Sequence, residues 1–401
     1  MKLSDINRNG NEIKELIERY MMDTYERFDF IAERAEGVYL YDENGKGYLD
    51  FYGGIAVNNA GNCNEEVVQA IAEQAKDIIH TFNYPYTIPQ ALLAELICGE
   101  LKMDKILFQN SGAEANEAMI KIARKYGVET YGAEKYHIVT AKKSFHGRTY
   151  AALSATGQPD TGCHLGFHPI LPGFSYADFN DLDSFRSMCT ENTIGIMVEP
   201  IQGEGGVHPG TLDFMTGLRK FCDENNILLL FDEIQTGWCR TGKIMAYEHY
   251  GVVPDILTMA KGMGGGMPIS AVCTSKELAR ALSMGSHGST YAGNPVCCAA
   301  SYAQINFLLK HDLAANADHM GNILKEAALG LPCVREVRGV GLLIGIELEK
   351  PVAVKVKHEC LEQGLLLTSI GDSIVRLTPP LTITEEDCKK AVGILKSVLQ
   401  R

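Results

Sequence analysis

An acidic residue and a lysine each follow a short apolar run in the middle of the chain. Asp232 comes directly after the run 228–231, and Lys261 lies just after the run 256–259. An unpaired carboxylate in a crevice is costly, so Asp232 is either a helix N-cap or the partner of a bound group. Lysine is usually a solvated surface charge. A lysine inside a glycine-rich turn at a strand end can instead reach into a crevice and form an imine with a carbonyl group.

A third candidate is a turn that could bind an anion. Ser111 and Glu114 have the S-x-x-E spacing of a helix capping box, which needs no function. The same turn could hold a phosphate, because Gly112 allows close approach of the backbone and the free amides of a first helical turn attract anions. Ser289 and Thr290 offer two further hydroxyls in a loop that could contact another phosphate oxygen.

These three features together fit pyridoxal phosphate. That cofactor needs a phosphate cup, an acid for its ring nitrogen and a lysine for a Schiff base. An anionic Asp232 keeps the ring nitrogen protonated, so that the ring draws electrons away from the carbanion of the substrate. A dinucleotide site would need G-x-G-x-x-G, and a P-loop would need G-x-x-x-x-G-K-[ST]. The chain carries neither motif.

The elements that must position these residues are those of an α/β protein. Short apolar runs predict buried strands at 106–108, 138–140, 194–198, 227–231 and 256–259. Amphipathic helical stretches lie between them, such as 114–126. Apolar strands that alternate with helices indicate a mostly parallel sheet covered on both faces. Ligands bind at the carboxyl ends of such strands, where all three candidate features stand.

The two ends of the chain predict a second, smaller domain. Asn44-Gly45 is a strong hairpin-turn signal, and helices alternate with strands after about residue 312. We expect a large cofactor-binding domain over 56–310. We expect a small α+β domain built from 1–55 together with 311–401.

Composition and charge exclude several function classes. The chain has 401 residues, and 37 basic against 50 acidic side chains give a net charge of −13, which argues against a nucleic-acid partner. No apolar run reaches the roughly 18 residues of a membrane span. The polar N-terminus lacks a signal-peptide core, so we expect a cytoplasmic protein. The twelve cysteines are scattered and lack zinc-site spacing, so we expect reduced, mostly buried thiols and no metal.

Seven segments carry a family signature across almost the whole chain. They are Asn110 to Glu117, Phe145 to Thr149, Val198 to Gly206, Phe231 to Gly237, Lys261, His287 to Tyr291, and Arg376 ahead of Pro379-Pro380. In this order they resemble the class III pyridoxal-phosphate aminotransferases of the ornithine and acetylornithine type. The resemblance implies a fold-type I architecture and an enzyme that acts on small amino and oxo acids.

The resemblance also implies roles around the cofactor. Lys261 would form the imine, Asp232 would pair with the ring nitrogen and Gln235 would hydrogen-bond the ring hydroxyl. Phe145 would stack on the ring. The phosphate would be held at Ser111, Gly112 and Ala113, and by Thr290 donated from the second subunit of a homodimer with shared active sites.

On the substrate side, two arginines suit a reaction that uses glutamate. Glutamate carries two carboxylates, and arginine is suited to planar bidentate recognition of each. Arg148 and Arg376 are the candidates, although a surface charge is the default interpretation of an arginine. Glu204 matches the family residue that pairs with this second arginine and swings aside for glutamate. Ser289 is a further predicted substrate contact.

The leading hypothesis is transfer of the δ-amine of N2-acetylornithine to 2-oxoglutarate, giving N-acetylglutamate 5-semialdehyde and glutamate in arginine biosynthesis. Segments 53–58 and 337–342 resemble acetylornithine-specific members of the family. Ornithine-specific members carry tyrosine in place of Ile55, yet Tyr39 stands where those members place a substrate-contacting tyrosine. Ornithine, 4-aminobutyrate and succinyl-diaminopimelate therefore remain alternative donors. The retained lysine, acid and arginines disfavour an aminomutase or a non-catalytic cofactor-binding scaffold.

Overall fold

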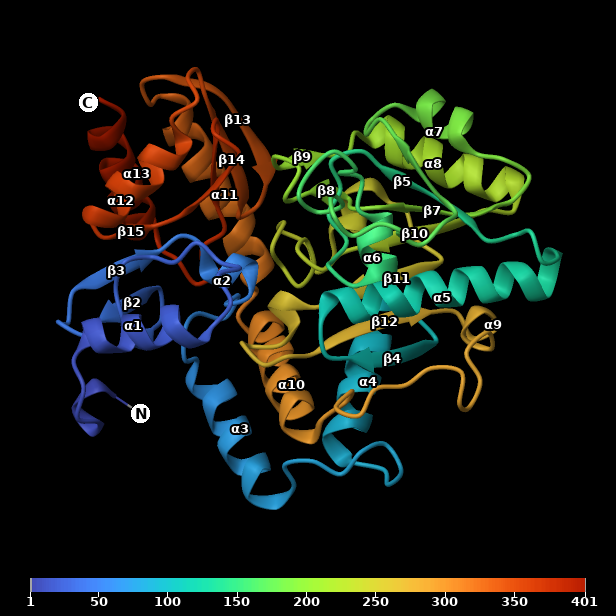
Figure 1. The fold of residues 1–401 in the computed structure, drawn as a ribbon, viewed down its shortest axis with the longest axis horizontal. Coiled ribbons are helices and arrows are strands. Elements are labelled where there is room, and N and C mark those ends of the chain that lie inside the picture. Colours follow the sequence, from blue (N-terminus) through green and yellow to red (C-terminus); the bar gives the residue numbers. More distant parts are fainter. Residues whose placement is uncertain (1, 401) are drawn as a thin grey trace.

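A seven-stranded sheet forms the centre of the computed structural model, which describes residues 2–400 (Figure 1). Its strand order is β4-β12-β11-β10-β7-β5-β6. The strands are β4 (Lys105–Gln109), β5 (His137–Ala141), β6 (Phe174–Ala177), β7 (Thr193–Val198), β10 (Leu228–Asp232), β11 (Ile256–Met259) and β12 (Ser270–Thr274). Only β12 runs antiparallel to its neighbours β4 and β11. The prediction of a mostly parallel central sheet is confirmed.

Each predicted apolar run falls on a strand of this sheet, but two strands were not predicted. Strand β6 is short and mostly half-buried, so its pattern is weak. Strand β12 reads Ser-Ala-Val-Cys-Thr, which is only weakly apolar, yet all its residues are buried because it lies between β4 and β11. Its burial comes from the position in the sheet rather than from its own side chains.

Helices on the sheet carry the turns that reach the candidate site. Helix α5 (Gly112–Tyr131) begins three residues after β4, packs on β11 and β12, and buries the predicted apolar face. The other helices of this region are α3 (Glu65–Asp77), α4 (Ile88–Leu101), α6 (Tyr150–Ala155), α7 (Leu182–Met188), α8 (Leu212–Asn225), α9 (Lys276–Ala279) and α10 (Pro295–Lys310). The start of α5 therefore lies at the edge of the sheet where the parallel strands end.

The two ends of the chain lie side by side, in blue and red in Figure 1. One sheet joins β1 (Ala32–Glu36), β2 (Tyr39–Asp42) and β3 (Gly47–Asp50) to β15 (Leu365–Leu366), which pairs with β3. A second sheet has the order β13 (Val334–Val340), β14 (Leu343–Leu348), β17 (Ile374–Leu377) and β16 (Thr368–Ile370). Helices α1 (Gly10–Tyr20), α11 (Leu313–Leu329), α12 (Ala353–Glu362) and α13 (Glu385–Leu399) cover these sheets, and the short α2 (Gly53–Ala56) follows β3.

This arrangement supports the proposed division into 56–310 and the joined segments 1–55 and 311–401, which remains a proposal. The predicted hairpin is confirmed, because β2 and β3 pair in antiparallel fashion around a turn in which Gly45 has φ 80°. All twelve cysteines are free thiols and most are buried. Within residues 2–400, no helix is long and apolar enough to cross a membrane.

Candidate functional site

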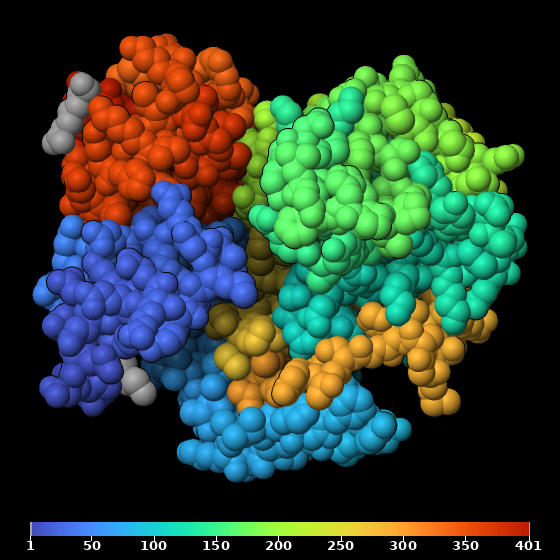
Figure 2. Space-filling view, in the orientation of Figure 1, coloured from blue at the N-terminus to red at the C-terminus, as the bar shows by residue number. Residues whose placement is uncertain are grey.

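The carboxyl ends of β4, β7, β10 and β11 border a cavity of about 490 Å³. Most of the predicted site residues line this cavity: Ser111, Gly112, Ala113, Phe145, Arg148, Glu204, Asp232, Gln235 and Lys261. Figure 2 shows the molecule hollowed between the blue N-terminal segment and the green and teal middle of the chain. Residues that are far apart in the sequence therefore meet at the edge of the sheet that the sequence predicted.

Lys261 begins a short 3-10 turn immediately beyond β11. Burial lowers the pKa of its ammonium group, while the nearby Glu204 carboxylate opposes this effect. Because the net effect is a lowered pKa, more of the amine is neutral near pH 7 than for a surface lysine. A neutral amine is a nucleophile and a base, so the lowered pKa favours the form of Lys261 that bond formation to an aldehyde requires.

The Asp232 carboxylate is buried and held from both sides. Its Oδ2 accepts a hydrogen bond from Asn116 Nδ2 at 2.7 Å and lies 2.8 Å from His146 Nδ1, while Oδ1 accepts from the Ile234 amide at 3.0 Å. The residues after Asp232 form turns, so this side chain caps no helix. Asn116 is itself fixed by the Thr258 hydroxyl, which donates to its Oδ1 at 2.8 Å.

The start of α5 forms the predicted capping box and also places backbone amides at the cavity. Ser111 and Glu114 form the predicted capping box, in which the Ser111 amide donates to Glu114 Oε2 at 2.8 Å. The amides of Gly112 and Ala113 belong to the same first turn, where α-helices have no internal acceptors for N–H groups. A Cβ on Gly112 would lie 2.9 Å from Ile234 Cδ1, so any larger residue there would require the Ile234 side chain to shift. The cavity thus has two backbone donors at a helix N-terminus.

Phe145 and Gln235 line the cavity between these groups. The Phe145 ring lies under the Arg148 guanidinium, 5.5 Å from its centroid. Gln235 donates through Nε2 to Glu204 Oε1 at 3.2 Å, while its own Oε1 is buried without a hydrogen-bond partner. A buried acceptor without a donor is costly, so this oxygen is a place for a bound hydroxyl group.

Glu199 is a buried acid that the sequence analysis did not single out. It follows β7, accepts from the Phe145 amide at 3.0 Å and from the Gly203 amide at 3.1 Å. Burial raises the pKa of its carboxyl group to about 7, and the charge of Asp232 adds to this effect. Its position directly after a buried strand was the one available signal.

Glu204 and Arg376 form an ion pair at the wall of the cavity. Glu204 lies in the loop between β8 (Ile201–Gln202) and β9 (His208–Pro209), and its Oε1 contacts Arg376 Nη1 from β17. Arg376 Nε donates to Thr368 Oγ1 at 3.1 Å. Burial alone would raise the pKa of Glu204, but the charges of Arg376 and Lys261 outweigh burial and lower it to about 2. The two predicted residues therefore form an ion pair that carries no net charge.

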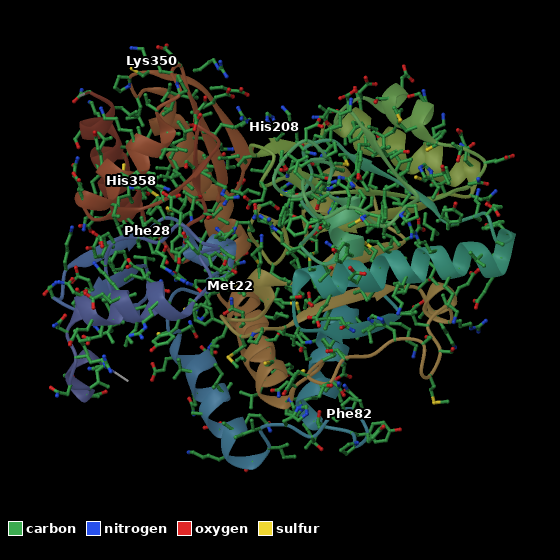
Figure 3. All side chains as sticks on the ribbon, viewed as in Figure 1. Met22, Phe28, Phe82, His208, Lys350 and His358 are labelled. Atoms are coloured by element: carbon green, nitrogen blue, oxygen red, sulfur yellow. The ribbon has the colours of Figure 1, made fainter. Side chains whose placement is uncertain are left out.

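A second cavity of about 390 Å³ lies on the other side of this pair. Ile55 lines it together with Glu204 and Arg376, and so do Phe28 and His358, which Figure 3 labels. Tyr39 lines neither cavity, and its hydroxyl accepts from Lys390 Nζ at 3.2 Å. The position that ornithine-specific members use for a substrate-contacting tyrosine therefore lies outside the lining of both cavities in this chain.

Ser289 and Thr290 lie outside the main cavity of their own chain. Ser289 Oγ accepts from Asn110 Nδ2 at 2.8 Å, next to the start of α5. Thr290 is exposed. Lys121 of α5 supports this loop by donating to the Ser286 carbonyl at 3.0 Å.

The groups in the cavity match the needs of pyridoxal phosphate. Gly112 and Ala113 amides would bind the phosphate, Asp232 would hold a proton on the ring nitrogen, and the orphaned Gln235 Oε1 would accept from the ring hydroxyl. Lys261 supplies the amine. Among residues 2–400, no group of three or more His, Cys, Asp and Glu side chains is placed to hold a metal ion.

The model of the family described as aminotransferase class III matches residues 20–399. The acetylornithine aminotransferase of Caldanaerobacter subterraneus subsp. tengcongensis is 44% identical over 95% of this chain and 97% of its own length. The acetylornithine aminotransferase of Bacillus subtilis is 43% identical over 94% of this chain and 97% of its own length. The ornithine aminotransferase of Toxoplasma gondii superposes with a TM-score of 0.93 at 30% identity, covering 99% of this chain and 96% of its own. The acetylornithine aminotransferase of Elizabethkingia anophelis superposes with a TM-score of 0.87 at 30% identity, covering 98% of this chain and 100% of its own.

The raised pKa of Glu199 predicts a pH-dependent stability. The folded protein keeps this proton up to about pH 7, whereas the unfolded chain loses it near 4.5, so the free energy of unfolding falls as pH rises between these values. Glu199→Gln should make the fall in the free energy of unfolding between pH 5 and pH 8 smaller by roughly 1–3 kcal/mol. Denaturant unfolding at both pH values measures it, with the exposed Glu129→Gln as control. Equal slopes for wild type and Glu199→Gln would contradict the assignment.

Lys261→Ala should abolish transamination while cofactor still binds weakly. The remaining backbone amides and Asp232 hold the cofactor, but the covalent attachment and the proton-transferring amine are gone. Turnover and retention of cofactor on gel filtration measure the two effects. Lys143→Ala, an exposed lysine near the same strand ends, is the control. Near-native turnover of the Lys261 variant would refute the role of this lysine.

Proposed function

The chain belongs to the class III aminotransferases, which depend on pyridoxal phosphate, and we propose that it transfers the terminal amine of N2-acetylornithine to 2-oxoglutarate. The products would be N-acetylglutamate 5-semialdehyde and glutamate, in arginine biosynthesis. The observation that carries this proposal is the Glu204–Arg376 pair beside Lys261. Relatives named acetylornithine aminotransferase, with identities such as 44% and 40% over nearly the whole chain, support the choice of donor.

When bound, pyridoxal phosphate supplies an aldehyde carbon that takes the amino group and a ring that withdraws electrons. The chain provides the rest. Asp232 would present its carboxylate to the ring nitrogen, and the contacts of that carboxylate with His146 and Asn116 hold it in place. Lys261, with its lowered pKa, moves the proton at the reacting carbon of the substrate.

Two substrates of different charge must use this site in turn. Glutamate reacts through its α-amine and so brings a carboxylate next to the reacting carbon, which Arg376 would bind once Glu204 releases it. Acetylornithine reacts through its terminal amine and brings only a methylene chain to the same place. An unpaired buried guanidinium there would cost several kcal/mol, and pairing with Glu204 removes that cost. Arg148, which lines the main cavity, would bind the distal carboxylate of either substrate.

Ornithine is the second candidate donor, because solved ornithine aminotransferases share the fold at TM-scores such as 0.93. Two features favour acetylornithine instead: Ile55 lines the cavity beside the Glu204–Arg376 pair, and Tyr39 lines neither cavity. Steady-state rates of the purified enzyme with acetylornithine, ornithine, 4-aminobutyrate and succinyl-diaminopimelate test the proposal. A higher kcat/KM for any other donor than for acetylornithine would overturn it.

We also propose a homodimer with shared active sites in the cytoplasm. Thr290 is exposed and outside the cavity of its own chain, so it is available to a second copy. The same surface presents large exposed apolar side chains at Phe82, Tyr84, Tyr86 and Tyr291. Figure 3 shows Phe82 at the outer edge of the molecule. A contiguous exposed apolar patch of this kind is typical of a subunit interface. The free cysteines fit a reducing compartment.

Shared sites predict complementation between two defective variants. Thr290→Ala should weaken cofactor binding, and Lys261→Ala should be inactive. In a mixed dimer of the two, one site would combine an intact Lys261 with an intact Thr290 from the other chain, so activity should return at limiting cofactor. Sedimentation of the wild type measures the dimer itself. Mixed dimers no more active than the Thr290→Ala variant alone would contradict a shared site.

Variants of the ion pair should separate the two half-reactions. Glu204→Ala leaves Arg376 unpaired, so the acetylornithine half-reaction should slow by about tenfold to a hundredfold while the glutamate half-reaction holds or improves. Arg376→Ala should do the opposite, because glutamate loses the partner of its carboxylate. Single-turnover absorbance changes of the bound cofactor measure each half-reaction. Parallel losses of both half-reactions in Glu204→Ala would mean that Glu204 is only a structural loop acid.

A further inference from the structure

A row of four residues crosses the C-terminal sheet beneath the loop that carries Glu204. Arg338 of β13 pairs with Gly345 of β14, Gly345 pairs with Arg376 of β17, and Arg376 pairs with Thr368 of β16. Residues directly opposite each other on neighbouring strands point to the same face of a sheet. Two arginines therefore stand on one face, separated by a residue that has no side chain.

The loop 203–207 lies on this face and is bound at two points. Glu204 contacts Arg376 through its side chain, and the Gly206 carbonyl accepts a hydrogen bond from Arg338 Nε at 2.8 Å. A Cβ on Gly345 would lie 3.0 Å from Val207 Cβ and 3.3 Å from the Gly206 oxygen, so any larger residue here would push on the loop. Figure 3 shows the adjacent His208 where this hairpin meets the C-terminal strands.

The loop needs such an anchor because its backbone is strained. Val207 has φ 57°, a left-handed conformation that a β-branched residue rarely adopts. Strained conformations persist where surrounding contacts over-determine them. Val207 is buried against Ile201 and Leu343, and Arg338 fixes the carbonyl that precedes it. Arg338 is itself buried and pairs with Glu336 at 2.9 Å and with Glu347, so its guanidinium is held in place.

We infer that Arg338 is a positioning residue for Glu204. By anchoring the Gly206 carbonyl, Arg338 keeps the loop docked while the Glu204 side chain leaves Arg376 and a substrate carboxylate takes its place. This inference rests on the exchange described under the proposed function. With the loop docked, Glu204 returns to Arg376 after each release. Without the anchor, Glu204 would lose its fixed distance from Arg376 and mask it less completely. Arg338 lines neither cavity, so in this inference it acts on Glu204 through the loop.

The test compares Arg338→Met with Glu204→Ala in binding of glutarate, a dicarboxylate that lacks any reacting group. Titration calorimetry on the purified holoenzyme measures the affinity for glutarate without turnover. This affinity rises when Arg376 is less often paired with Glu204. Both variants should bind glutarate more tightly, Arg338→Met by roughly threefold to tenfold, and the double variant should be no tighter than Glu204→Ala. Arg335→Met is the matched control, because Arg335 lies on the same strand and also pairs with Glu347 but makes no bond to the loop. It should leave glutarate affinity unchanged.

Two further variants guard against a simple folding defect. Gly345→Ala pushes on Val207 while keeping every arginine, so it should tighten glutarate in the same direction. Arg338→Lys keeps a cation and a donor, so it should restore part of the wild-type affinity. The half-reaction rates should agree with the glutarate affinities. In Arg338→Met the acetylornithine half-reaction should be slower, and the glutamate half-reaction should change by less than about twofold.

Unchanged glutarate affinity in Arg338→Met and Gly345→Ala, or an additive double variant, would overturn the inference and leave the proposed function standing. An Arg335→Met variant that behaved like Arg338→Met would also overturn it, because the charge cluster would then matter and the loop bond would not. A wild type inactive with acetylornithine would instead refute the proposed donor, and the glutarate titrations would still decide the role of Arg338.

Discussion

A buried guanidinium that must never be left without a partner governs the design of this site. Arg376 is almost fully buried, and it lies close enough to Lys261 to disfavour a second positive charge. Glu204 neutralises it in the structure at hand, and a substrate carboxylate does so during half of the reaction we propose. Because an uncompensated buried charge costs several kcal/mol, one of these anions is needed at all times. The choice between them is the choice between the two substrates.

This requirement explains why the site is built from two distant parts of the chain. Lys261 and Asp232 lie at strand ends of the parallel sheet, and Glu204 lies in the loop between β8 and β9. Arg376 comes from a strand of the C-terminal sheet. The ion pair therefore joins the two parts at the cavity. The loop 203–207 is the mechanical link, held to the C-terminal sheet by Arg338 and to the parallel sheet by the Gly203 amide on Glu199.

The cofactor side of the cavity follows a different rule, in which rigid groups surround the place of a bound ring. Asp232 is held by His146 and Asn116, and the first turn of α5 packs closely against Ile234 at Gly112. Charges that stay fixed suit a cofactor that remains bound through both half-reactions. On the substrate side the charges must exchange partners, and there the structure places an ion pair on a loop.

The sequence by itself determined the parallel strands with strong apolar runs, the Asn44-Gly45 hairpin, the capping box at Ser111 and the polar residues at strand ends, because each depends on neighbours in the chain. Residue types also pointed to pyridoxal phosphate, since few cofactors need a lysine, an acid and a phosphate cup together. The tertiary structure alone decided that weakly apolar β12 is buried, that His146 holds Asp232, that Glu199 is desolvated and that Tyr39 lines neither cavity. It also decided the row from Arg338 to Thr368, which depends on the register of four strands. Burial and register are set by residues far apart in the sequence, and no local pattern records them.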